Sequence, residues 1–455
     1  MGKPAVVILA AGKGTRMCSE LVKVLHPVCG EPMLAPVLRA AHDLKPRRTL
    51  VVIGYQAERV REAFPDQDFV IQEPQNGTGH AVLCALEALQ GFRGDIIVLS
   101  GDIPLLTSST AGKVLAVHGE SQAEMTVLTA MAENPDSYGR MVRNKEGRVI
   151  RIVEQRDALE KEKAIREVNT GIYAFRASFL RRFLPTIGRG NAQGEYYLTD
   201  LAVVAGKRGT LATNQAEDFL EIRGINTRVD LAEVDRVART RVITELMLAG
   251  VTIIDPAITY IHRGVRIGRD TVIYPNCHIE GRTVIGEGCQ IHPGCRIVDT
   301  RIGSGVVIKT SCVITECTIE NGVRVGPFAH LRPGSRLCRD VSVGNFVEVK
   351  KSHLGPGTKA NHLTYLGDSV IGRGVNVGCG TITCNYDGVK KHTTTIGDNV
   401  FVGSDVQFVA PVAVGDDAVI GAGSTITEDV PPDSLALARS RQVNLEGRGR
   451  KKDKG

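Results

Sequence analysis

The sequence has no tryptophan, and aromatic residues make up only 4% of its 455 residues. Cysteine is also scarce, with eleven residues of which no two are spaced as CxxC. A disulfide scaffold contains about 8–10% cysteine, so a framework of disulfides is excluded. We therefore expect reduced thiols in a cytoplasmic protein.

Long hydrophobic runs are missing as well. The longest, Ala5–Ala11, is much shorter than the ~20 residues of a membrane-spanning helix, and no long apolar stretch after a basic start marks a secretory signal. The net charge of +6 is concentrated at the end of the chain, because residues 439–455 hold seven Lys or Arg against two Asp or Glu. With no aromatic stacking platform or reader motif, we expect neither membrane insertion nor nucleic-acid binding, and we interpret 439–455 as a basic tail.

The length predicts two or three domains at ~100–200 residues each, and the composition changes near residue 250. Before that point, short aliphatic runs alternate with helical stretches. Buried strands separated by helices indicate an α/β domain with a largely parallel sheet, whose ligands bind at the carboxyl ends of the strands. The predicted strands are Ala5–Ala10, Thr49–Gly54, Phe69–Gln72, Asp95–Ser100, Glu124–Ala130 and Thr170–Phe175.

A helical period follows between residues 227 and 250, and predicts a linker helix. Thr227 and Asp230 have the spacing of a capping box, and Gly250 is a suitable C-terminal stop. The apolar face is predicted to contain Val234, Val237, Ala238, Val242, Leu246 and Ala249.

After Gly250 an aliphatic residue recurs every six positions, often followed by glycine. This is the hexapeptide signature of a left-handed parallel β-helix, in which three hexapeptides form one triangular coil. Residues 253–430 would then form about ten coils with their aliphatic residues stacked inside. The runs in step are Ile267 to Ile297, Val325 to Val349, and Ile396 to Ile426.

The same period argues against a metal site in the second half. Cys277, Cys289 and Cys295 differ by multiples of six and so occupy the same inward-facing position of their hexapeptides. Cys312 and Cys317 lie where the beat skips a residue. For all five we favour core packing over metal ligation.

Two motifs of the first half follow predicted strands. The segment Leu9–Met17 is a glycine turn with two cations, which lets backbone N–H groups approach phosphate oxygens, although it is neither a Walker A loop nor a full dinucleotide fingerprint. The strand ending at Ser100 delivers Asp102 to its carboxyl end, where a carboxylate is well placed for Mg²⁺. Each motif alone is also typical of an ordinary turn, and their combination favours a phosphate site.

With these residues the chain closely resembles the bacterial bifunctional N-acetylglucosamine-1-phosphate uridylyltransferases and glucosamine-1-phosphate acetyltransferases. The resemblance covers nearly the whole chain and implies four parts: a Rossmann-like uridylyltransferase domain (1–226), a linker helix (227–250), a β-helix N-acetyltransferase domain (251–438) and a basic tail (439–455). The ordered motifs of the first half are Leu9–Met17, Lys23–Leu25, Gln72–Ala81, Gly101–Asp102, Tyr138–Arg140, Glu154, Asn169–Gly171, Glu195–Asp200 and Asn226.

The resemblance implies two sets of site residues. In the first half Arg16 and Lys23 would face the phosphates of UTP, and Asp102 and Asn226 would hold Mg²⁺. The uridine nucleotide and the sugar would be bound by Leu9, Ala10, Ala11, Gly12, Lys23, Gln72, Gly77, Thr78, Gly139, Glu154, Asn169 and Asn226. The family usually has proline where this sequence has Val22, which puts the stiffness of the Lys23 loop in question.

In the second half polar residues interrupt the repeat in one cluster. An amine must lose a proton to attack the thioester of acetyl-CoA, and His362 is the candidate base. Glucosamine phosphate would be bound by Arg332, Lys350, Tyr365, Asn376 and Asn385, and acetyl-CoA by Cys379, Asn385, Tyr386, Ser404, Ala422 and Arg439. The family usually has alanine at the position of Cys379.

The resemblance also implies a homotrimer formed through the β-helix, because related acyltransferases build their sites between neighbouring prisms. Two alternatives stay open at this point. One is a nucleotidylyltransferase for another base or sugar fused to a β-helix, and the other is a catalytically silent scaffold of the same two modules. Arg16, Lys23, Asp102, Asn226 and His362 are all present, which argues against a silent protein.

Overall fold

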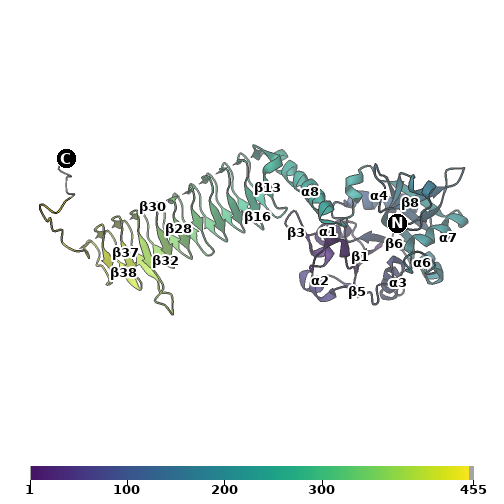
Figure 1. The fold of residues 1–455 in the computed structure, drawn as a ribbon, viewed down its shortest axis with the longest axis horizontal. Coiled ribbons are helices and arrows are strands. Elements are labelled where there is room, and N and C mark those ends of the chain that lie inside the picture. Colours follow the sequence, from purple (N-terminus) through teal and green to yellow (C-terminus); the bar gives the residue numbers. More distant parts are fainter. Residues whose placement is uncertain (1, 450–455) are drawn as a thin grey trace, which may run out of the picture. The chain divides into compact units, whose positions relative to one another are not determined.

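The computed structural model describes residues 2–449, and its chain divides into two compact units between Ala238 and Arg239, within helix α8 (Arg228–Leu248). Met1 and the last six residues of the predicted basic tail lie outside the described residues. Figure 1 shows the α/β unit with its helices and the second unit with its stacked strands. Among the described residues, no helix is both long and apolar enough to cross a bilayer.

The first unit is built on a nine-stranded mixed sheet. Its strands are β1 (Ala5–Leu9), β4 (Arg48–Ile53), β5 (Phe69–Ile71), β6 (Asp95–Ser100), β7 (Met125–Met131), β8 (Gly139–Arg143), β9 (Val149–Val153), β10 (Glu167–Arg176) and β11 (Leu211–Gln215). The order is β11-β7-β10-β6-β1-β4-β5, with β8 paired to β10 and β9 to β8. A two-stranded hairpin of β2 (Pro27–Val28) and β3 (Glu31–Pro32) stands apart.

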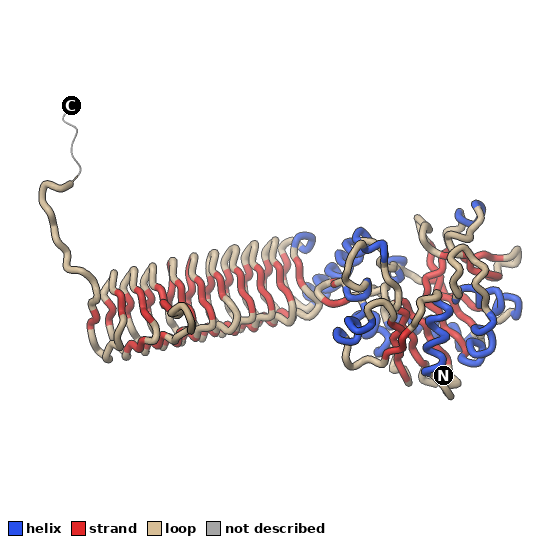
Figure 2. Tube along the Cα trace, turned by 60° about the horizontal axis from the view of Figure 1, so that its bottom comes forward, coloured by secondary structure: helices blue, strands red, loops and turns tan. Residues whose placement is uncertain are grey.

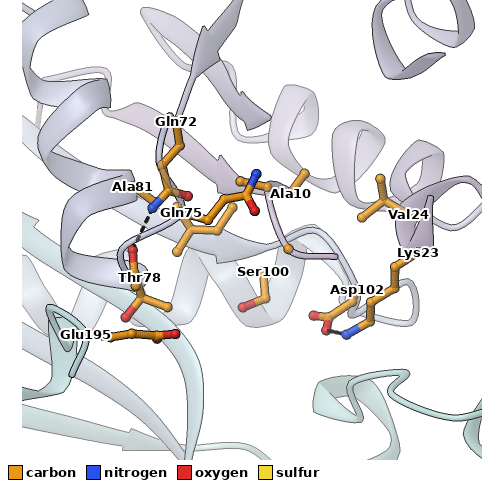
Figure 3. Close-up of a pocket in the computed structure, with 14 residues that line it drawn as sticks. Ala10, Lys23, Val24, Gln72, Gln75, Thr78, Ala81, Ser100, Asp102 and Glu195 are labelled. Atoms are coloured by element: carbon orange, nitrogen blue, oxygen red, sulfur yellow. Dashed lines mark hydrogen bonds and ion pairs between the residues drawn. The ribbon is translucent and has the colours of Figure 1, made fainter. Parts of the chain in front are cut away.

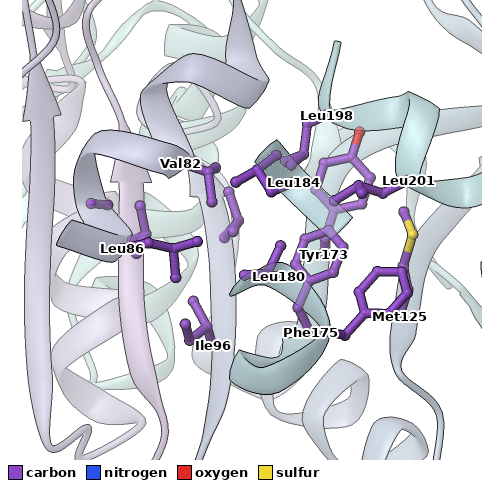
Figure 4. Close-up of a cluster of buried hydrophobic side chains, with 14 of the residues drawn as sticks. Val82, Leu86, Ile96, Met125, Tyr173, Phe175, Leu180, Leu184, Leu198 and Leu201 are labelled. Carbon is purple, nitrogen blue, oxygen red and sulfur yellow. The ribbon is translucent and has the colours of Figure 1, made fainter. Parts of the chain in front are cut away.

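Seven further helices belong to this unit in the described chain, besides short 3₁₀ turns. They are α1 (Leu34–Asp43), α2 (Ala57–Ala63), α3 (Thr78–Ala88), α4 (Ser108–Glu120), α5 (Glu160–Lys163), α6 (Ala177–Phe183) and α7 (Leu201–Arg208). Side chains of α3, α6 and α7 pack against alternate residues of β1, β4, β6, β7 and β10, as Figure 4 shows for part of this core. The intervening strand residues, such as Ile8, Val51 and Ile97, are fully buried too. The strands are therefore covered on both faces, which explains their lack of polar alternation.

All six predicted strands are present, and the α/β fold is confirmed. The sheet is more mixed than the aliphatic runs indicate, because β10 is antiparallel to both β6 and β7. Strands β8, β9 and β11 are not among the predicted ones. Their sequences are short or rich in polar residues, as in Leu211–Gln215, so hydrophobic pattern alone does not mark them.

Helix α8 begins with the predicted capping box. Asp230 Oδ2 accepts hydrogen bonds from Thr227 N (2.8 Å) and Thr227 Oγ1 (2.8 Å), and Asp230 N donates to Thr227 Oγ1 (3.1 Å). At the other end Gly250 has φ +94°, the conformation expected of a C-terminal glycine. The predicted apolar face is confirmed at Val234, Ala238 and Val242, but Ala249 is exposed and follows the end of the helix.

The second unit is the predicted parallel β-helix. Its three sheets have eleven, ten and nine parallel strands, so each sheet contributes about one strand per coil (Figure 2). Equivalent residues pair from coil to coil, as in Ile273 with Ile291 and Ile279 with Ile297. These side chains are buried in the prism, which confirms the six-residue pattern.

The strand bounds follow the repeat. The first sheet has β12 (Thr252–Ile253), β15 (Val272–Ile273), β18 (Gln290–Ile291), β21 (Val307–Ile308), β24 (Arg324–Val325), β27 (Ser342–Asn345), β30 (Lys359–His362), β33 (Asn376–Val377), β36 (Phe401–Val402), β39 (Val419–Ile420) and β41 (Leu435–Ala436). The second has β13 (Tyr260–Ile261), β16 (His278–Glu280), β19 (Arg296–Val298), β22 (Val313–Thr315), β25 (His330–Leu331), β28 (Glu348–Lys350), β31 (Tyr365–Gly367), β34 (Ile382–Cys384), β37 (Gln407–Val409) and β40 (Thr425–Ile426). The third has β14 (Arg266–Ile267), β17 (Val284–Ile285), β20 (Arg301–Ile302), β23 (Thr318–Ile319), β26 (Arg336–Leu337), β29 (His353–Leu354), β32 (Ser369–Ile371), β35 (Thr394–Ile396) and β38 (Val412–Val414).

The core thiols of the prism act as hydrogen-bond donors between coils. All eleven cysteines of the chain are free, and the five discussed above are buried, which confirms the packing interpretation. Cys289 Sγ donates to Gly303 O of the next coil (3.1 Å), and Thr271 Oγ1 makes the equivalent bond to Gly286 O one coil earlier (2.8 Å). In these two coils a small side chain donates to the next coil, whereas Val306 and Val323 fill the equivalent position of the following coils without a donor.

Cys289→Ser is expected to be tolerated much better than Cys289→Ala. Serine keeps a donor for the Gly303 carbonyl, whereas alanine leaves that partly buried acceptor without this partner, at a cost of about 1 kcal/mol. The measurement is the thermal unfolding of both variants, followed by circular dichroism. Equal unfolding temperatures for the two variants would show that the bond contributes nothing.

Candidate active sites

A pocket of about 310 Å³ opens at the carboxyl ends of β1 and β6, where an α/β sheet is expected to bind its ligand. Figure 3 shows Lys23 and Asp102 facing each other on one side of the pocket and Gln72, Thr78 and Glu195 on the other. The pocket is lined by Leu9, Ala10, Ala11, Gly12, Lys23, Val24, Gln72, Gln75, Gly77, Thr78, Ala81, Ser100, Asp102 and Glu195.

The glycine turn after β1 forms one wall of this pocket. Ala10 N donates to Val52 O (2.8 Å), which continues the ladder between β1 and β4 past the end of β1. Gly14 has φ +61°, and a Cβ atom there would lie 2.7 Å from Lys23 Cβ. Only glycine therefore lets the turn pack so closely against Lys23.

The Lys23 loop keeps the backbone that proline would impose. Val22 is buried and has φ −53°, close to the ~−65° that a proline ring fixes. Leu25 N donates to Val22 O (2.9 Å) and closes a 3₁₀ turn over Lys23–Leu25. Val22 thus reproduces the local geometry by packing rather than by a ring.

The opposite wall is formed by the segment from Gln72 to Thr78. Gln72 is buried, and its Nε2 donates to Gly77 O (2.8 Å). Gly77 has φ +98°, and a Cβ there would lie 2.6 Å from Tyr196 O. Thr78 begins α3, and its Oγ1 accepts from Leu198 N (3.1 Å). The segment is therefore held rigidly from inside.

Four polar residues from separate segments converge beside the pocket. Lys23 Nζ forms an ion pair with Asp102 and donates to Asn226 Oδ1 (3.0 Å), and Arg16 Nη2 donates to the same oxygen (3.0 Å). Ile225 N donates to Asp102 O (3.0 Å), which brings Asn226 alongside Asp102. The structure thus brings together the cationic and oxygen-bearing side chains that lie in separate motifs of the sequence.

The oxygen donors of Asp102 and Asn226 suit a hard cation. Mg²⁺ is commonly held by one or two protein carboxylates together with substrate phosphates, rather than by a cage of protein ligands. Residues 2–449 contain no group of three or more His, Cys, Asp or Glu side chains able to hold a metal ion. A carboxylate and an amide oxygen facing a phosphate pocket fit Mg²⁺ bound in this way.

Gly139, Glu154 and Asn169 come together on β8, after β9 and on β10. Gly139 pairs with Asn169, and a Cβ on Gly139 would lie 3.5 Å from Glu154 Oε1 and from Asn169 Cβ. Glu154 Oε1 accepts from Thr199 Oγ1 (3.2 Å), and Asn169 Nδ2 donates to Tyr173 OH (2.7 Å). Burial raises the pKa of Glu154, and the charges of Asp157 and Asp200 raise it further.

Three polar pocket residues were missed as single site candidates. Ser100 is the last residue of β6, whereas Gln75 and Glu195 lie inside quoted motifs without having been assigned a role. The position of Ser100 at the carboxyl end of a central strand is the signal that could have identified it. A Cβ on Gly171, two residues after Asn169, would lie 3.0 Å from Ser100 Oγ, so this serine joins the pocket to the Gly139 group.

On the β-helix, the candidate base His362 is oriented by a neighbouring coil. His362 pairs with Asn345 in register, and its Nδ1 lies 2.9 Å from Asn345 Oδ1. An amide oxygen can only accept a hydrogen bond, so Nδ1 carries the proton in this contact. The lone pair of Nε2 is then free to accept a proton. Asn345 is a further residue that the sequence pattern did not identify.

Cations and carboxylates lie along the second sheet of the prism, which follows the sheet of His362 in each coil. Arg332 forms an ion pair with Glu348 (2.8 Å), and Lys350 lies 3.6 Å from Asp368. Asp368 Oδ2 also accepts from Asn385 Nδ2 (2.5 Å). Tyr365 pairs with Glu348, and Asn376 follows one coil after Lys359, so the predicted sugar-phosphate residues lie on consecutive coils.

Lys391 is a further cation that was missed. It lies in the loop between β34 and β35, which leaves the six-residue beat and projects from the prism (Figure 1). A side-chain hydrogen bond with Lys350 lowers the pKa of Lys391, and the positive charge of Lys350 lowers it further, so the two side chains are neighbours. In the sequence Lys390–Lys391 is typical of a solvated loop, and only the fold brings it to Lys350.

Four of the predicted acetyl-CoA residues, Cys379, Ser404, Ala422 and Arg439, form a column along one corner of the prism, whereas Asn385 and Tyr386 lie in the loop between β34 and β35. Asp405 N donates to Cys379 O (2.7 Å), Gly423 N donates to Ser404 O (2.8 Å), and Arg439 Nη1 donates to Ala422 O (2.6 Å). Cys379 is half-buried, while Ser404 and Ala422 are exposed. With ~4.8 Å between coils, three steps from His362 to Ala422 cover about 14 Å. The column is therefore long enough to receive an extended chain.

Comparisons with known proteins cover both units. Residues 6–167 match the family of MobA-like NTP transferase domains, 257–352 match the GMPPB C-terminal domain, and 393–428 match six bacterial transferase hexapeptide repeats. The chain is 54% identical over 451 residues to the bifunctional protein GlmU of Pelobacter propionicus, with 98% of both chains covered. It is 52% identical over 468 residues to GlmU of Geobacter sulfurreducens (98% of both) and 49% identical over 459 residues to GlmU of Geobacillus thermodenitrificans (99% of this chain and 100% of the relative). An NTP transferase unit followed by a hexapeptide β-helix, aligned along almost the full length of these relatives, shows that the chain belongs to the family of bifunctional GlmU proteins.

Proposed function

We propose that the pocket beside Asp102 is the uridylyltransferase site of this bifunctional enzyme, and that the corner around His362 is its acetyltransferase site. The enzyme transfers the acetyl group of acetyl-CoA to glucosamine 1-phosphate, then transfers the uridylyl group of UTP to the N-acetylated product. The product, UDP-N-acetylglucosamine, supplies peptidoglycan and lipopolysaccharide synthesis. The convergence of Arg16, Lys23, Asp102 and Asn226 is the observation that carries the first assignment.

In uridylyl transfer, a phosphate oxygen of N-acetylglucosamine 1-phosphate attacks the α-phosphorus of UTP. The bond from this phosphorus to the bridging oxygen breaks, and pyrophosphate leaves. The attacking phosphate is already anionic, so the site must align the reactants and neutralise charge rather than remove a proton. Arg16 and Lys23 supply positive charge at the phosphates.

Asp102 and Asn226 would hold Mg²⁺, which neutralises phosphate charge when bound. The backbone at Leu9–Gly12 and at Gly77–Thr78, with Gln72, would hold the uridine nucleotide between the two walls of the pocket. Both walls are fixed from inside by the hydrogen bonds described above, so they can bind the base without reorganising.

Gly139, Glu154 and Asn169 would grip the sugar. Asn169 is buried, and Gly139 has no side chain to fill the space next to Glu154 Oε1. The carboxylate of Glu154 can accept hydrogen bonds from sugar hydroxyls, and the amide of Asn169 can both donate and accept them.

Glu154→Gln is expected to weaken sugar-phosphate binding and to stabilise the fold at the same time. A carboxyl whose pKa is higher in the folded than in the unfolded chain destabilises the fold as the pH rises through its folded pKa. The variant should therefore unfold at a higher temperature than the wild type at about pH 8. The difference should vanish at about pH 4, where the side chain at position 154 is uncharged in the wild type as well as in the variant. Because a neutral acceptor binds hydroxyls less strongly, KM for N-acetylglucosamine 1-phosphate should rise ~10-fold.

Thermal unfolding at the two pH values and initial rates of pyrophosphate release measure the two effects. Thr199→Val is the matched control, because it removes the hydrogen bond to Glu154 and leaves the carboxylate in place. A lower unfolding temperature for Glu154→Gln at about pH 8 would contradict the burial argument.

In acetyl transfer, the amine of glucosamine 1-phosphate attacks the thioester carbon of acetyl-CoA. His362 Nε2 accepts the proton from the nitrogen, the carbon–sulfur bond breaks, and coenzyme A leaves as the thiol. Asn345 Oδ1 keeps the other ring nitrogen protonated, so Nε2 is the basic atom. Arg332, Lys350 and Lys391 provide positive charge for the sugar phosphate, with Tyr365, Asn376 and Asn385 beside them.

Acetyl-CoA would lie along the corner column, with its thioester near His362 and Cys379. Its chain would then pass Ser404 and Ala422 toward Arg439, and Asn385 and Tyr386 would contact it from the loop between β34 and β35. The guanidinium at the root of the tail is suited to a phosphate of the nucleotide end.

We also propose a homotrimer, and a cytoplasmic location. Phe328, Phe346 and Leu363 project from successive coils with exposed fractions of 51%, 56% and 58%, and the two phenylalanine rings stack at 5.4 Å. An apolar ridge next to His362 favours a second copy of the chain as its cover, which would enclose the acetyl site. The eleven free thiols favour a reducing compartment, and the cytoplasm is also where UTP and acetyl-CoA are supplied.

The test of the proposed function is one incubation with glucosamine 1-phosphate, acetyl-CoA, UTP and Mg²⁺, with each omitted in turn. Free thiol should appear without UTP, and pyrophosphate release should require acetyl-CoA. Pyrophosphate without acetyl-CoA would mean that glucosamine 1-phosphate itself is uridylylated, and would overturn the proposed order.

A further inference from the structure

The first turns of helix α8 are bonded to both loops that carry the phosphate-facing cations. Arg228 Nε donates to Met17 O (3.3 Å), and Arg228 Nη1 lies 3.2 Å from His26 Nδ1. Met17 is the neighbour of Arg16, and His26 follows the 3₁₀ turn that begins at Lys23. A single side chain therefore bridges the two loops.

The protonation state of His26 decides which group donates the hydrogen bond between Arg228 and His26. His26 is buried, and burial lowers its pKa, as does the positive charge of Arg228. The ring is therefore neutral, and its Nδ1 accepts from the guanidinium. Arginine is the donor that remains charged beside such a ring and has a second N–H for the carbonyl of Met17.

Asp235 extends the contact by two helical turns. It lies seven residues after Arg228 and so on the same face of α8, and its Oδ1 accepts from Cys29 N (2.7 Å). Cys29 has φ +50° and lies in the turn between β2 and β3, directly after the Lys23 loop. A hydrogen bond to a carboxylate is among the stronger ones and fixes this turn against the helix.

The same helix end also fixes Asn226. Asn226 N donates to Asp230 Oδ2 (3.1 Å), so the capping box of α8 holds the residue that contacts both Arg16 and Lys23. Between β1 and α1 the chain has only two 3₁₀ turns and the β2–β3 hairpin. These loops have no ladder of the main sheet to hold them, so the bonds to α8 anchor them in addition to the side-chain contacts of Arg16 and Lys23 described above.

We propose that Arg228 and Asp235 are positioning residues for uridylyl transfer, which hold the Arg16 and Lys23 loops in register with Asp102 and Asn226. The inference rests on the proposed roles of Arg16 and Lys23. A displacement of a cation by about 1 Å in such a site lowers the rate by as much as ~100-fold, so loosening one anchor should affect the chemical step more than the sugar pocket.

The test compares Arg228→Met, Arg228→Lys and Arg208→Met in the full-length enzyme. Arg208 is an exposed arginine of the same unit that pairs with Glu124 (2.7 Å), far along the chain from the two loops, and it serves as the matched control. Arg228→Met should lower kcat/KM for UTP ~10-fold, with KM for N-acetylglucosamine 1-phosphate within about 2-fold of the wild type. Arg228→Lys should recover part of the loss, because an ammonium can still donate to one of the two loops.

Hydrogen exchange of the segment 13–29 gives a second readout that does not depend on activity. Exchange should be faster in Arg228→Met than in Arg208→Met, and Asp235→Ala should accelerate it around Cys29. If Arg228→Met does not fold, as judged by circular dichroism, Arg228→Lys and Asp235→Ala provide the same comparison. Values of kcat/KM and exchange rates equal to those of Arg208→Met would overturn the inference.

A third arm separates this inference from the proposed function. Lys23→Ala should lower uridylyl transfer more than Arg228→Met does, because it removes the cation itself. If Lys23→Ala has no effect, the proposed function of the pocket fails. If Lys23→Ala is impaired and Arg228→Met is not, only the positioning role fails.

Discussion

Replacing His362 by alanine is expected to lower acetyl transfer by about 10³-fold and to leave uridylyl transfer unchanged. The amine of glucosamine 1-phosphate must lose a proton as it attacks, and Asn345 on the preceding coil holds His362 Nδ1, which leaves Nε2 free to accept that proton. The measurement is the rate of thiol release from acetyl-CoA, alongside pyrophosphate release with N-acetylglucosamine 1-phosphate supplied directly. The second rate reports on a unit that does not contain the substitution.

His278→Ala is the matched control for this experiment. His278 is also an exposed histidine of the β-helix, but it stacks on Tyr260 at 4.6 Å, several coils before the candidate site. It should retain acetyl transfer. Thiol release by His362→Ala at the rate of His278→Ala would show that another group takes the proton.

Replacing Asp102 by alanine is expected to have the opposite effect, lowering uridylyl transfer by about 10²–10³-fold with acetyl transfer intact. The substitution removes the carboxylate at the carboxyl end of β6 and leaves Lys23 without its carboxylate partner. The site then loses both the group that holds the Lys23 ammonium in place and the carboxylate proposed to bind Mg²⁺. Pyrophosphate release measures the first activity, and thiol release the second.

Asp95→Ala serves as the control on the same strand. Asp95 begins β6, at the end opposite to the pocket, and pairs with Arg176 (2.8 Å). The His118 side chain and Arg176 lower the pKa of Asp95, so its loss should reduce stability. Its kcat should nevertheless stay near the wild-type value, and a loss equal to that of Asp102→Ala would assign the effect to folding rather than to the site.

The sequence allowed the fold to be predicted wherever a strict period governs the side chains. Buried strands of the α/β unit and the six-residue beat of the prism follow directly from which residues must lie inside. The capping box at Thr227 was predictable because both partners are close in sequence. Strands β8 and β9 were not, because a hairpin that packs on one part of the sheet needs no continuous apolar run.

The candidate sites divide in the same way. Asp102 closely follows a predicted strand, so its position in the sequence indicates it, whereas Lys23 was indicated by the resemblance to the family. Asn345 and Lys391 become visible only once the coils are stacked, since each acts through a neighbour 17 or 41 positions away, His362 or Lys350. Arg228 depends on two loops about 200 residues earlier, and no local pattern could have paired them.

The most direct test of two independent sites on one chain is to mix the His362→Ala and Asp102→Ala proteins. Neither should make UDP-N-acetylglucosamine from glucosamine 1-phosphate, acetyl-CoA and UTP alone. The mixture should make it after a lag, because Asp102→Ala releases N-acetylglucosamine 1-phosphate that His362→Ala then uridylylates. No product from the mixture, despite each variant retaining its remaining activity, would contradict the account of two separate sites that share a diffusible intermediate.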